Sequence, residues 1–425
     1  MKSGRKSKKY AVLMAGLLMF ACGCGNTQPA GGVSAPTEAV KEIPTIQISL
    51  WGDERYIPIL EEAMQAFQAE HADEVVIDYR ISKEGEDTCK ETVLADPEGA
   101  ADIFTFADDQ MEELWKAGAL LQITQGEEQV LASVGGYDSA AAKAAMRDGK
   151  LYAYPLSAGN GYFLYYNDAY FSGSDVLSLD RILEVAEENG KKFSMDFGSG
   201  WYIYSFFKGA GLDMTAAEDG SANLCNWNAT DTEYTGVDVA ETMLALAGRE
   251  GFINQSDDGF VAGVESGEVI AGINGAWNAG KVEAAWGEHY AATKLPACTI
   301  AGDQVQMCSF VGYKMTGINA HTKYPEWCMR IAEYLTGEEY QLKRFEAVGE
   351  CPAALNAAAE EEVQAAPAVA ALGQQAEFGY AQNVLQPFWD ASARFGVMMA
   401  GGNPDGKDLQ KVLDDMVQQI TAPVE

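Results

Sequence analysis

The pattern of apolar and polar positions predicts strands and helices that alternate along most of the chain. Residues 45–50 alternate between apolar and polar side chains, as in a strand with one buried face. A helix follows, because Pro58 suits a first helical turn and apolar residues recur along one face after it. Residues 75–79 form a second apolar run. A strand, a helix and a strand in this order predict a parallel pair, and therefore an α/β protein.

One stretch near the middle of the chain combines a strand signal with a candidate binding surface. Gly267 suits the end of a short helix, and residues 269–273 form the apolar run expected of a strand buried on both faces. Ligands of open α/β sheets bind beyond the carboxyl ends of strands. Trp277, which lies there between Asn274 and Asn278, is therefore either part of a binding surface or a cap on the core. The stretch alone favours neither interpretation.

Length and charge narrow the class of protein. The chain has 425 residues, which suits two domains, and 48% of them are hydrophobic, enough for large cores. It carries 29 basic and 63 acidic residues, a formal charge of −34. So acidic a surface argues against nucleic acid or anionic lipid as a partner.

The N-terminus predicts export. A basic region precedes the apolar run at residues 10–21, which is too short to span a bilayer and matches a secretory signal. The following Cys22-Gly23-Cys24 resembles a bacterial lipobox, in which a small residue precedes a lipid-modified Cys. We expect residues 1–23 to be a signal peptide, Cys24 to be lipidated and residues 24–43 to form a tether. Lipidation at Cys22, or an ordinary signal cleaved after a small residue, are the alternatives.

Motifs for catalysis or metal binding do not stand out. The six cysteines after Cys24 are scattered without a CxxC pair, and the chain has three His residues, so no metal site is suggested. GxSxG, HExxH and phosphate-loop patterns are absent from the sequence. We therefore expect a protein that is not an enzyme and has no cofactor. Among 63 acidic residues some close carboxylate pair is inevitable, so a glycosidase stays open as an alternative.

Two cysteines fall on a predicted hairpin. Residues 292–316 read as two strands joined by a turn at residues 302–304. That turn sets Cys298 opposite Cys308, and an exported protein could then form a disulfide between them. A slip of one residue would turn the two thiols apart and leave them free and buried.

Several segments resemble one family. The chain is similar to the extracellular solute-binding proteins of family 1 that feed sugar importers, in particular to the maltose- and maltodextrin-binding group. The similar segments are residues 101–124, 151–171, 263–280, 311–320 and 349–354, and they follow one another in the same order as in the family. The resemblance covers nearly everything after residue 44. It implies a two-lobed α/β periplasmic-binding-protein fold of type II with three crossovers between lobes. Lobe one would comprise residues 44–157 and 314–358, and lobe two residues 159–312 and 360–425.

The resemblance also implies a set of ligand-binding residues. Positions of the family that stack on sugar correspond to Trp277, Trp389, Trp201, Tyr202 and Phe106. Positions of the family that bind hydroxyl groups correspond to Asp109 and to Asp53 with Glu54 or Arg55. We also expect Asn278, which flanks Trp277, to belong to the ligand-binding surface. Two positions depart from the family: Gln110 stands where the maltose binder has Arg, and Asn160 is the nearest polar substitute for an absent acid. The loss of a charged, bidentate donor at Gln110 implies a different sugar preference.

These expectations combine into a function. The protein would capture an oligosaccharide, with a malto-oligosaccharide as the first candidate, between its lobes and deliver it to the membrane permease of an ABC importer. It would work as a monomer on the outer face of the cytoplasmic membrane, held there only by its lipid anchor. The alternatives are another oligosaccharide or a non-sugar solute on the same fold, and a lipid-anchored glycan-degrading enzyme.

Overall fold

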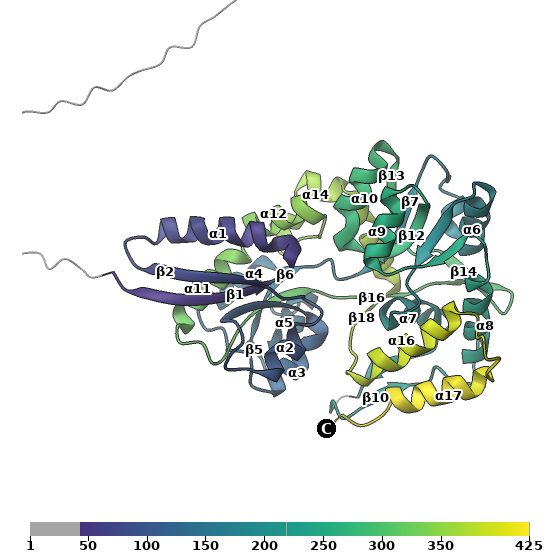
Figure 1. Cartoon of the computed structure of the whole chain (residues 1–425). Coiled ribbons are helices and arrows are strands. Elements are labelled where there is room, and N and C mark those ends of the chain that lie inside the picture. Colours follow the sequence, from purple (N-terminus) through teal and green to yellow (C-terminus); the bar gives the residue numbers. More distant parts are fainter. Residues whose placement is uncertain (1–42, 218, 425) are drawn as a thin grey trace, which may run out of the picture. The chain divides into compact units, whose positions relative to one another are not determined.

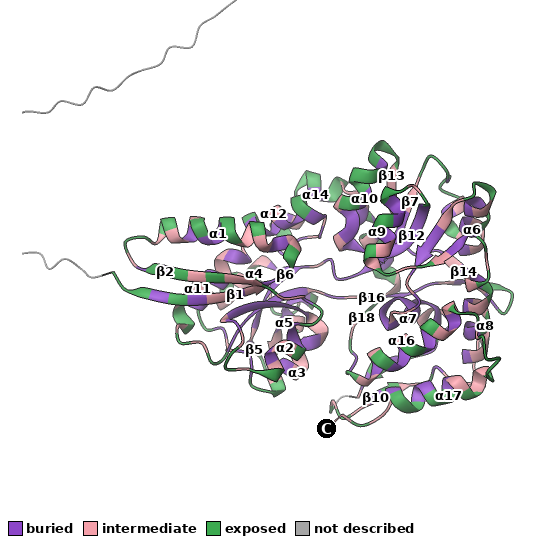
Figure 2. Cartoon of the chain, in the orientation of Figure 1, coloured by how far each residue is buried: buried purple, intermediate pink, exposed green. Residues whose placement is uncertain are grey.

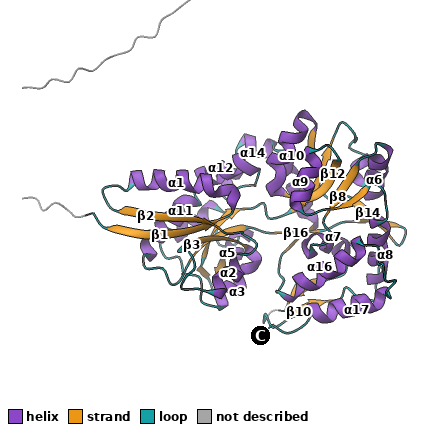
Figure 3. Ribbon diagram, viewed as in Figure 1, coloured by secondary structure: helices purple, strands orange, loops and turns teal. Residues whose placement is uncertain are grey.

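Two five-stranded sheets, each covered by helices, organise the protein in a computed structural model that describes residues 43–217 and 219–424 (Figures 1 and 3). The expectations for the signal peptide, for Cys22 and Cys24 and for the tether fall on residues outside this part. Within the described part, no helix is both long and apolar enough to cross a membrane.

The first sheet contains the parallel pair that the sequence predicts. Its strand order is β2 (Val76–Lys83), β1 (Thr45–Gly52), β3 (Ile103–Ala107), β17 (Lys314–Ile318) and β6 (Ala153–Ser157). Strand β1 runs parallel to β2 and to β3, which confirms the predicted strand–helix–strand unit. Strand β17 returns from later in the chain and runs antiparallel to β3 and β6.

Helices cover this sheet and complete the first core. The long helix α1 (Ile57–Glu70) begins with Pro at its first turn and packs on β2 and on α11 (Pro325–Leu335) and α12 (Glu338–Val348). Figure 2 shows its outer face exposed and its inner face buried. The remaining elements of this region are α2 (Cys89–Ala95), α3 (Met111–Lys116), α4 (Glu127–Ser133), α5 (Ala140–Ala145), β4 (Met146–Arg147) and β5 (Lys150–Leu151). We call this sheet with its helices lobe one.

The second sheet is also mixed and contains the central stretch of the sequence. Its order is β11 (Phe252–Asn254), β8 (Lys192–Met195), β12 (Val269–Gly275), β7 (Tyr162–Asn167) and β13 (Tyr290–Thr293). Every residue of β12 is buried, as its apolar run predicts. Its helices are α6 (Leu179–Glu188), α7 (Gly200–Gly209), α8 (Gly236–Ala247), α9 (Asp257–Glu265), α10 (Ala279–Trp286), α14 (Glu361–Ala365), α15 (Pro367–Gln375), α16 (Pro387–Ala400) and α17 (Leu409–Ile420), whereas α13 (Leu355–Ala358) packs on α12 of lobe one. We call this assembly lobe two.

The chain passes between the two sheets three times, as expected. It leaves the first sheet between β6 and β7 and returns between β16 (Ser309–Val311) and β17. It leaves again after α12, which packs on α1, and reaches α15, which packs on β7 and β13. The segments that connect the sheets therefore lie side by side, and they position the site described below.

The predicted register of the 292–316 hairpin is wrong. The strands are β14 (Ala297–Ile300) and β15 (Asp303–Gln306), joined at Ala301 and Gly302, both of which have positive φ. This two-residue turn sets Cys298 opposite Val305 rather than opposite Cys308. Cys308 lies beyond the end of β15, and both thiols are free. The left-handed turn matches the twist of the strands, so the shorter loop is favoured over the predicted three-residue turn.

Candidate functional site

Two adjoining cavities lie between the lobes. The first, of about 540 Å³, is lined by four large aromatic side chains and is called the aromatic cavity here. The second has a volume of about 690 Å³. Asp109, Asn160 and Gln382 line both, so the two cavities form one cleft.

The aromatic cavity brings together residues from distant parts of the chain. Trp201 and Tyr202 begin α7, Trp389 lies in the first turn of α16, and Trp277 lies in a short 3₁₀ turn, Ala276–Asn278, after β12. The rings of Trp201 and Trp277 are stacked, with centroids 5.3 Å apart and planes inclined by 29°. All four predicted lobe-two aromatics therefore line one cavity.

A carboxylate that the sequence analysis missed positions two of these rings. Asp257, the first residue of α9, accepts hydrogen bonds from Trp277 Nε1 and from the Tyr202 hydroxyl, both at 2.8 Å. Asn274 Nδ2 donates a third at 3.1 Å. An acidic residue in a first helical turn is ordinarily explained by the helix dipole, so nothing local in the sequence distinguishes Asp257.

Asn278 does not face the ligand cleft. It is buried, and its Nδ2 donates to Asn274 Oδ1 at 2.7 Å. Because Asn274 in turn binds Asp257, Asn278 supports the loop that carries Trp277 instead of contacting a ligand. The prediction that Asn278 belongs to the binding surface is corrected accordingly.

Phe106 is a core residue. Its side chain is fully buried and packs 6.0 Å from the ring of Phe104 in the core of lobe one. All five residues of β3 are buried, and the strand residue that lines the aromatic cavity is Ala107. The expectation that Phe106 stacks on a ligand is therefore wrong, because this strand is covered on both faces.

The first loop is also placed away from the cleft cavities. Asp53 accepts two hydrogen bonds from the Arg55 guanidinium, at 2.8 and 3.1 Å, and Glu54 forms an exposed ion pair with Lys83. Asp53, Glu54 and Arg55 line neither cavity. Arg55 instead approaches Glu86, with Nη2 4.0 Å from Oε2. The loop thus belongs to a charge cluster beneath the cleft.

Gln110 lines the aromatic cavity but is fully engaged with the backbone. Its Nε2 donates to the carbonyls of Glu86 and Asp87, at 2.7 and 3.0 Å, and its Oε1 accepts from the Lys90 amide at 2.9 Å. Gln110 therefore fixes the segment 86–90. That segment carries Lys90, whose Nζ lies 3.0 Å from Glu113 Oε1 and 3.1 Å from Gln386 Oε1.

Two adjacent, half-buried carboxyl groups, Asp108 and Asp109, line the cleft. Burial, followed by the charge of Asp109, raises the pKa of Asp108 to about 7. Burial also raises the pKa of Asp109, against the opposing effects of Lys314 and Lys90. Within residues 43–217 and 219–424, Oδ1 of each carboxyl has no hydrogen-bond partner. These enclosed acceptors without a partner favour the protonated forms of the two carboxyl groups.

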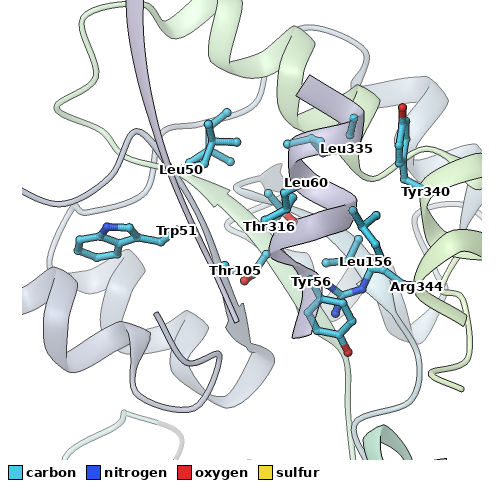
Figure 4. A pocket seen from close by; sticks show the side chains of 14 residues that line it. Leu50, Trp51, Tyr56, Leu60, Thr105, Leu156, Thr316, Leu335, Tyr340 and Arg344 are labelled. Carbon is cyan, nitrogen blue, oxygen red and sulfur yellow. The ribbon is translucent and has the colours of Figure 1, made fainter. Parts of the chain in front are cut away.

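A buried charge cluster underlies the cleft at the third crossover. Arg344 Nη2 lies 3.0 Å from both Glu86 Oε1 and Glu350 Oε2, and all three side chains are buried. Burial opposes ionisation of Glu350, yet the charge of Arg344, together with those of Lys314 and Arg55, holds its pKa below the usual value. The Arg344 guanidinium lies 3.4 Å from the centroid of the Tyr56 ring. Figure 4 shows these two groups together beside a small, mostly apolar cavity of about 20 Å³ in the core of lobe one.

The fold and the cleft define a class of protein. A two-lobed α/β molecule with an aromatic and polar cleft between its lobes is built to enclose a small solute. A family model of bacterial extracellular solute-binding proteins matches residues 62–371. The chain belongs to this family, which confirms the family resemblance.

Particular relatives refine this assignment. A galactooligosaccharide-binding protein of Bacillus subtilis (strain 168) is 25% identical over 395 residues, which cover 89% of this chain and 87% of that protein. A solved structure with acarbose is similar at 27% identity and a TM-score of 0.78, covering 89% of this chain and 99% of its own. The maltodextrin binding protein MalE1 of L. casei BL23 has 22% identity and a TM-score of 0.72, with coverage of 89% and 99%. The expected two-lobed fold class is thereby confirmed.

Proposed function

We propose that this protein captures a neutral oligosaccharide in the cleft, with a malto-oligosaccharide as the first candidate. The observation that carries the proposal is the aromatic cavity, where four aromatic side chains meet polar groups at hydrogen-bonding positions. Aromatic faces cover the apolar faces of sugar rings, while carboxylate and amide groups bind the hydroxyl groups. Trp277 and Trp389, which are partly buried, supply exposed faces, whereas Trp201 and Tyr202 line the wall of the cavity at only 8% and 3% exposure. Asp109 and Asn160 supply polar groups.

Capture needs no chemistry on the sugar. The cleft walls come from both lobes, so a ligand that contacts both walls binds the closed arrangement better than an open one. This difference in affinity draws the lobes together. The family and the named relatives are binding proteins, which supports a binding function over a glycan-degrading one.

The partner in this proposal is the permease of an ABC importer. The protein would present its closed, loaded form to the permease from the outer face of the cytoplasmic membrane. It would be a monomer, tethered through a lipid on Cys24, with the lobe boundaries that the sequence predicts: residues 44–157 and 314–358 for lobe one, and residues 159–312 and 360–425 for lobe two. The two sheets described above support these boundaries.

A galacto-oligosaccharide is the second candidate. The Bacillus subtilis relative is named for such a sugar. The family position that carries Arg in the maltose binder is Gln110 here, and the Gln110 amide is occupied by backbone groups. A site without that charged donor would select hydroxyl patterns differently.

A thermal-shift screen followed by calorimetry tests the function. Maltotriose, a β-1,4-galactotriose, acarbose and trigalacturonate form the panel, and a ligand that binds only the native state raises the melting temperature. We expect a neutral oligosaccharide to raise it by several degrees. A panel in which no neutral sugar shifts the melting temperature would contradict the proposal. Shortening of starch fragments after long incubation, seen by thin-layer analysis, would favour the enzyme.

A further inference from the structure

Lys314 is a buried ammonium group at the wall of the aromatic cavity. It is the first residue of β17, the strand that enters lobe one from the second crossover. Only 7% of the residue is exposed, and it lines the cavity opposite the aromatic residues of lobe two. Its Nζ lies 5.7 Å from the centroid of the Trp277 ring. In the sequence, Lys314 stands out as the charged residue of a strand whose residues are all buried.

The hydrogen-bonding capacity of this ammonium group is unused. Its Nζ lies 3.9 Å from Glu86 Oε2, beyond hydrogen-bond distance. Across the described residues, no side-chain hydrogen bond of Lys314 Nζ is found, and Glu86 Oε2 also has no hydrogen-bond partner. Lys90, the other ammonium group that lines the cavity, is in contrast bound to Glu113 and Gln386.

One role of Lys314 is to compensate the charge of a buried carboxylate. The cluster beneath the cleft contains the acids Asp53, Glu86 and Glu350 and the bases Arg55, Arg344 and Lys314. Three negative and three positive groups balance, so Lys314 compensates one buried carboxylate. This role explains the charge of Lys314 but not why its Nζ, unlike the enclosed Glu86 Oε2, stays accessible at the wall of the cavity without a hydrogen-bond partner among the described residues.

We propose that Lys314 is a ligand-binding residue that donates to an oxygen of the sugar ring stacked on Trp277. The carboxyl group of Asp109, which lines the same cavity, would accept from a neighbouring hydroxyl of the same ligand, so that the two residues together recognise adjacent oxygen atoms. The inference rests on the proposed oligosaccharide-binding function and identifies the charged donor of this site. The sugar is neutral, because Glu86 lies 3.9 Å from the ammonium group and Asp109 lines the same cavity, and these acidic groups would repel a carboxylate on the ligand.

The test separates ligand binding from charge compensation. Glu86→Gln removes the carboxylate that Lys314 faces, and Glu86→Gln/Lys314→Met then removes the ammonium group without leaving that carboxylate uncompensated. Calorimetry with whichever panel sugar binds the parent should show affinity about 10- to 100-fold lower for the double variant than for Glu86→Gln. Lys343→Met, a surface change on α12, is the control and should keep the parent affinity. Equal affinities of the double variant and Glu86→Gln would reduce Lys314 to a counter-ion and overturn the proposal.

Two further comparisons, one of Lys314 variants and one of ligands, test the same inference. If the Glu86 variants fail to fold, Lys314→Gln should bind more tightly than Lys314→Met, because both lack the charge but the glutamine keeps an N–H donor; equal affinities would overturn the inference. Trigalacturonate should not compete with the neutral sugar, and tighter binding of trigalacturonate would refute the ligand class. A parent protein that binds no panel sugar overturns the proposed function and the inference together, whereas a binding parent with an unaffected double variant overturns the inference alone.

Discussion

At the residue scale, the site depends on side chains that hold the aromatic rings as much as on the rings themselves. Asp257 receives hydrogen bonds from Trp277 and Tyr202, and Asn274 joins it to the loop after β12. Trp201 Nε1 donates to Gln382 Oε1 at 2.8 Å. These bonds fix the orientation of the Trp277, Tyr202 and Trp201 rings before a ligand arrives, which reduces the entropy that binding costs.

Trp277→Ala should weaken sugar binding. We expect a loss of roughly 1–3 kcal/mol in binding free energy, because a stacking face is removed from the cavity. The free energy of unfolding should change less, since Trp277 is only partly buried. Calorimetry on the variant and thermal melts without ligand measure the two effects.

Trp286→Ala is the matched control for this prediction. Trp286 is 8% exposed and packs in a core of lobe two. Its loss should cost roughly 3–5 kcal/mol of stability and leave affinity nearly unchanged. A Trp277→Ala protein that melts far lower yet binds as tightly as the parent would place Trp277 in the core.

Asp108→Asn should change how stability depends on pH. The pKa of Asp108 is about 7 in the folded protein, whereas an unfolded chain releases this proton near pH 4. Between these values the folded state binds more protons, so the free energy of unfolding of the parent falls as pH rises. The Asn side chain has no proton to lose, so the variant should gain stability relative to the parent from pH 4 to 7, by at most about 4 kcal/mol.

Thermal melts of the ligand-free proteins across this pH range measure the difference. Asp390→Asn, at an exposed position of α16, is the control and should show no such trend. A difference between Asp108→Asn and the parent that stays constant from pH 4 to 7 would be inconsistent with a protonated Asp108.

At the scale of elements, the cavity depends on the close approach of α16 to the turn before α7. A Cβ atom on Gly396 would lie 1.6 Å from the backbone carbonyl oxygen of Phe197. Helix α16 carries Trp389, and the turn that ends at Ser199 leads into Trp201 and Tyr202. The small residue on α16 therefore sets the distance between the elements that carry three of the four rings.

Gly396→Ala should separate these two elements. We expect a cost of roughly 1–3 kcal/mol in stability, as for other overpacked cores, and weaker sugar binding because the rings shift. Gly401→Ala is the control, since a Cβ there would meet its nearest atom at 3.4 Å. Chemical denaturation and calorimetry test both variants. Unchanged stability of Gly396→Ala would show that the backbone relaxes without cost.

At the scale of the whole molecule, contacts across the cleft already join the lobes. Lys90 on α2 bonds Gln386 before α16, and Lys314 on β17 faces Trp277 after β12. A ligand would add to these contacts, and the permease would receive the closed form. Under the proposed function, delivery would also require that the protein stay near the membrane.

Cys24→Ala should release the protein from the membrane, because a lipid on Cys24 is the expected anchor. Fractionation of expressing cells, with immunoblots of membrane and medium or periplasm, measures the distribution. Cys22→Ala should stay membrane-bound. If Cys22→Ala is released while Cys24→Ala stays bound, the lipid is carried by Cys22.

The sequence by itself determined the elements and their order. The alternation at residues 45–50 indicates a strand with one buried face, and the apolar run at residues 269–273 indicates a strand buried on both faces. The structure has strands β1 and β12 at these positions. The aromatic residues Trp201, Tyr202, Trp277 and Trp389 each begin or follow an element whose end the local pattern marks, and all four line one cavity. That they bind a ligand stays a prediction.

Only the tertiary structure decided which polar groups face the cleft. Phe106 and Asn278 are buried, and Asp53, Glu54 and Arg55 lie outside the cavities, because long-range packing rather than local periodicity covers them. Asp257 and Lys314 enter the site for the same reason, since their partners lie 17 residues or more away in the chain. The turn at Ala301 and Gly302 separates Cys298 from Cys308, because a shift of one or two residues in a hairpin changes every cross-strand neighbour.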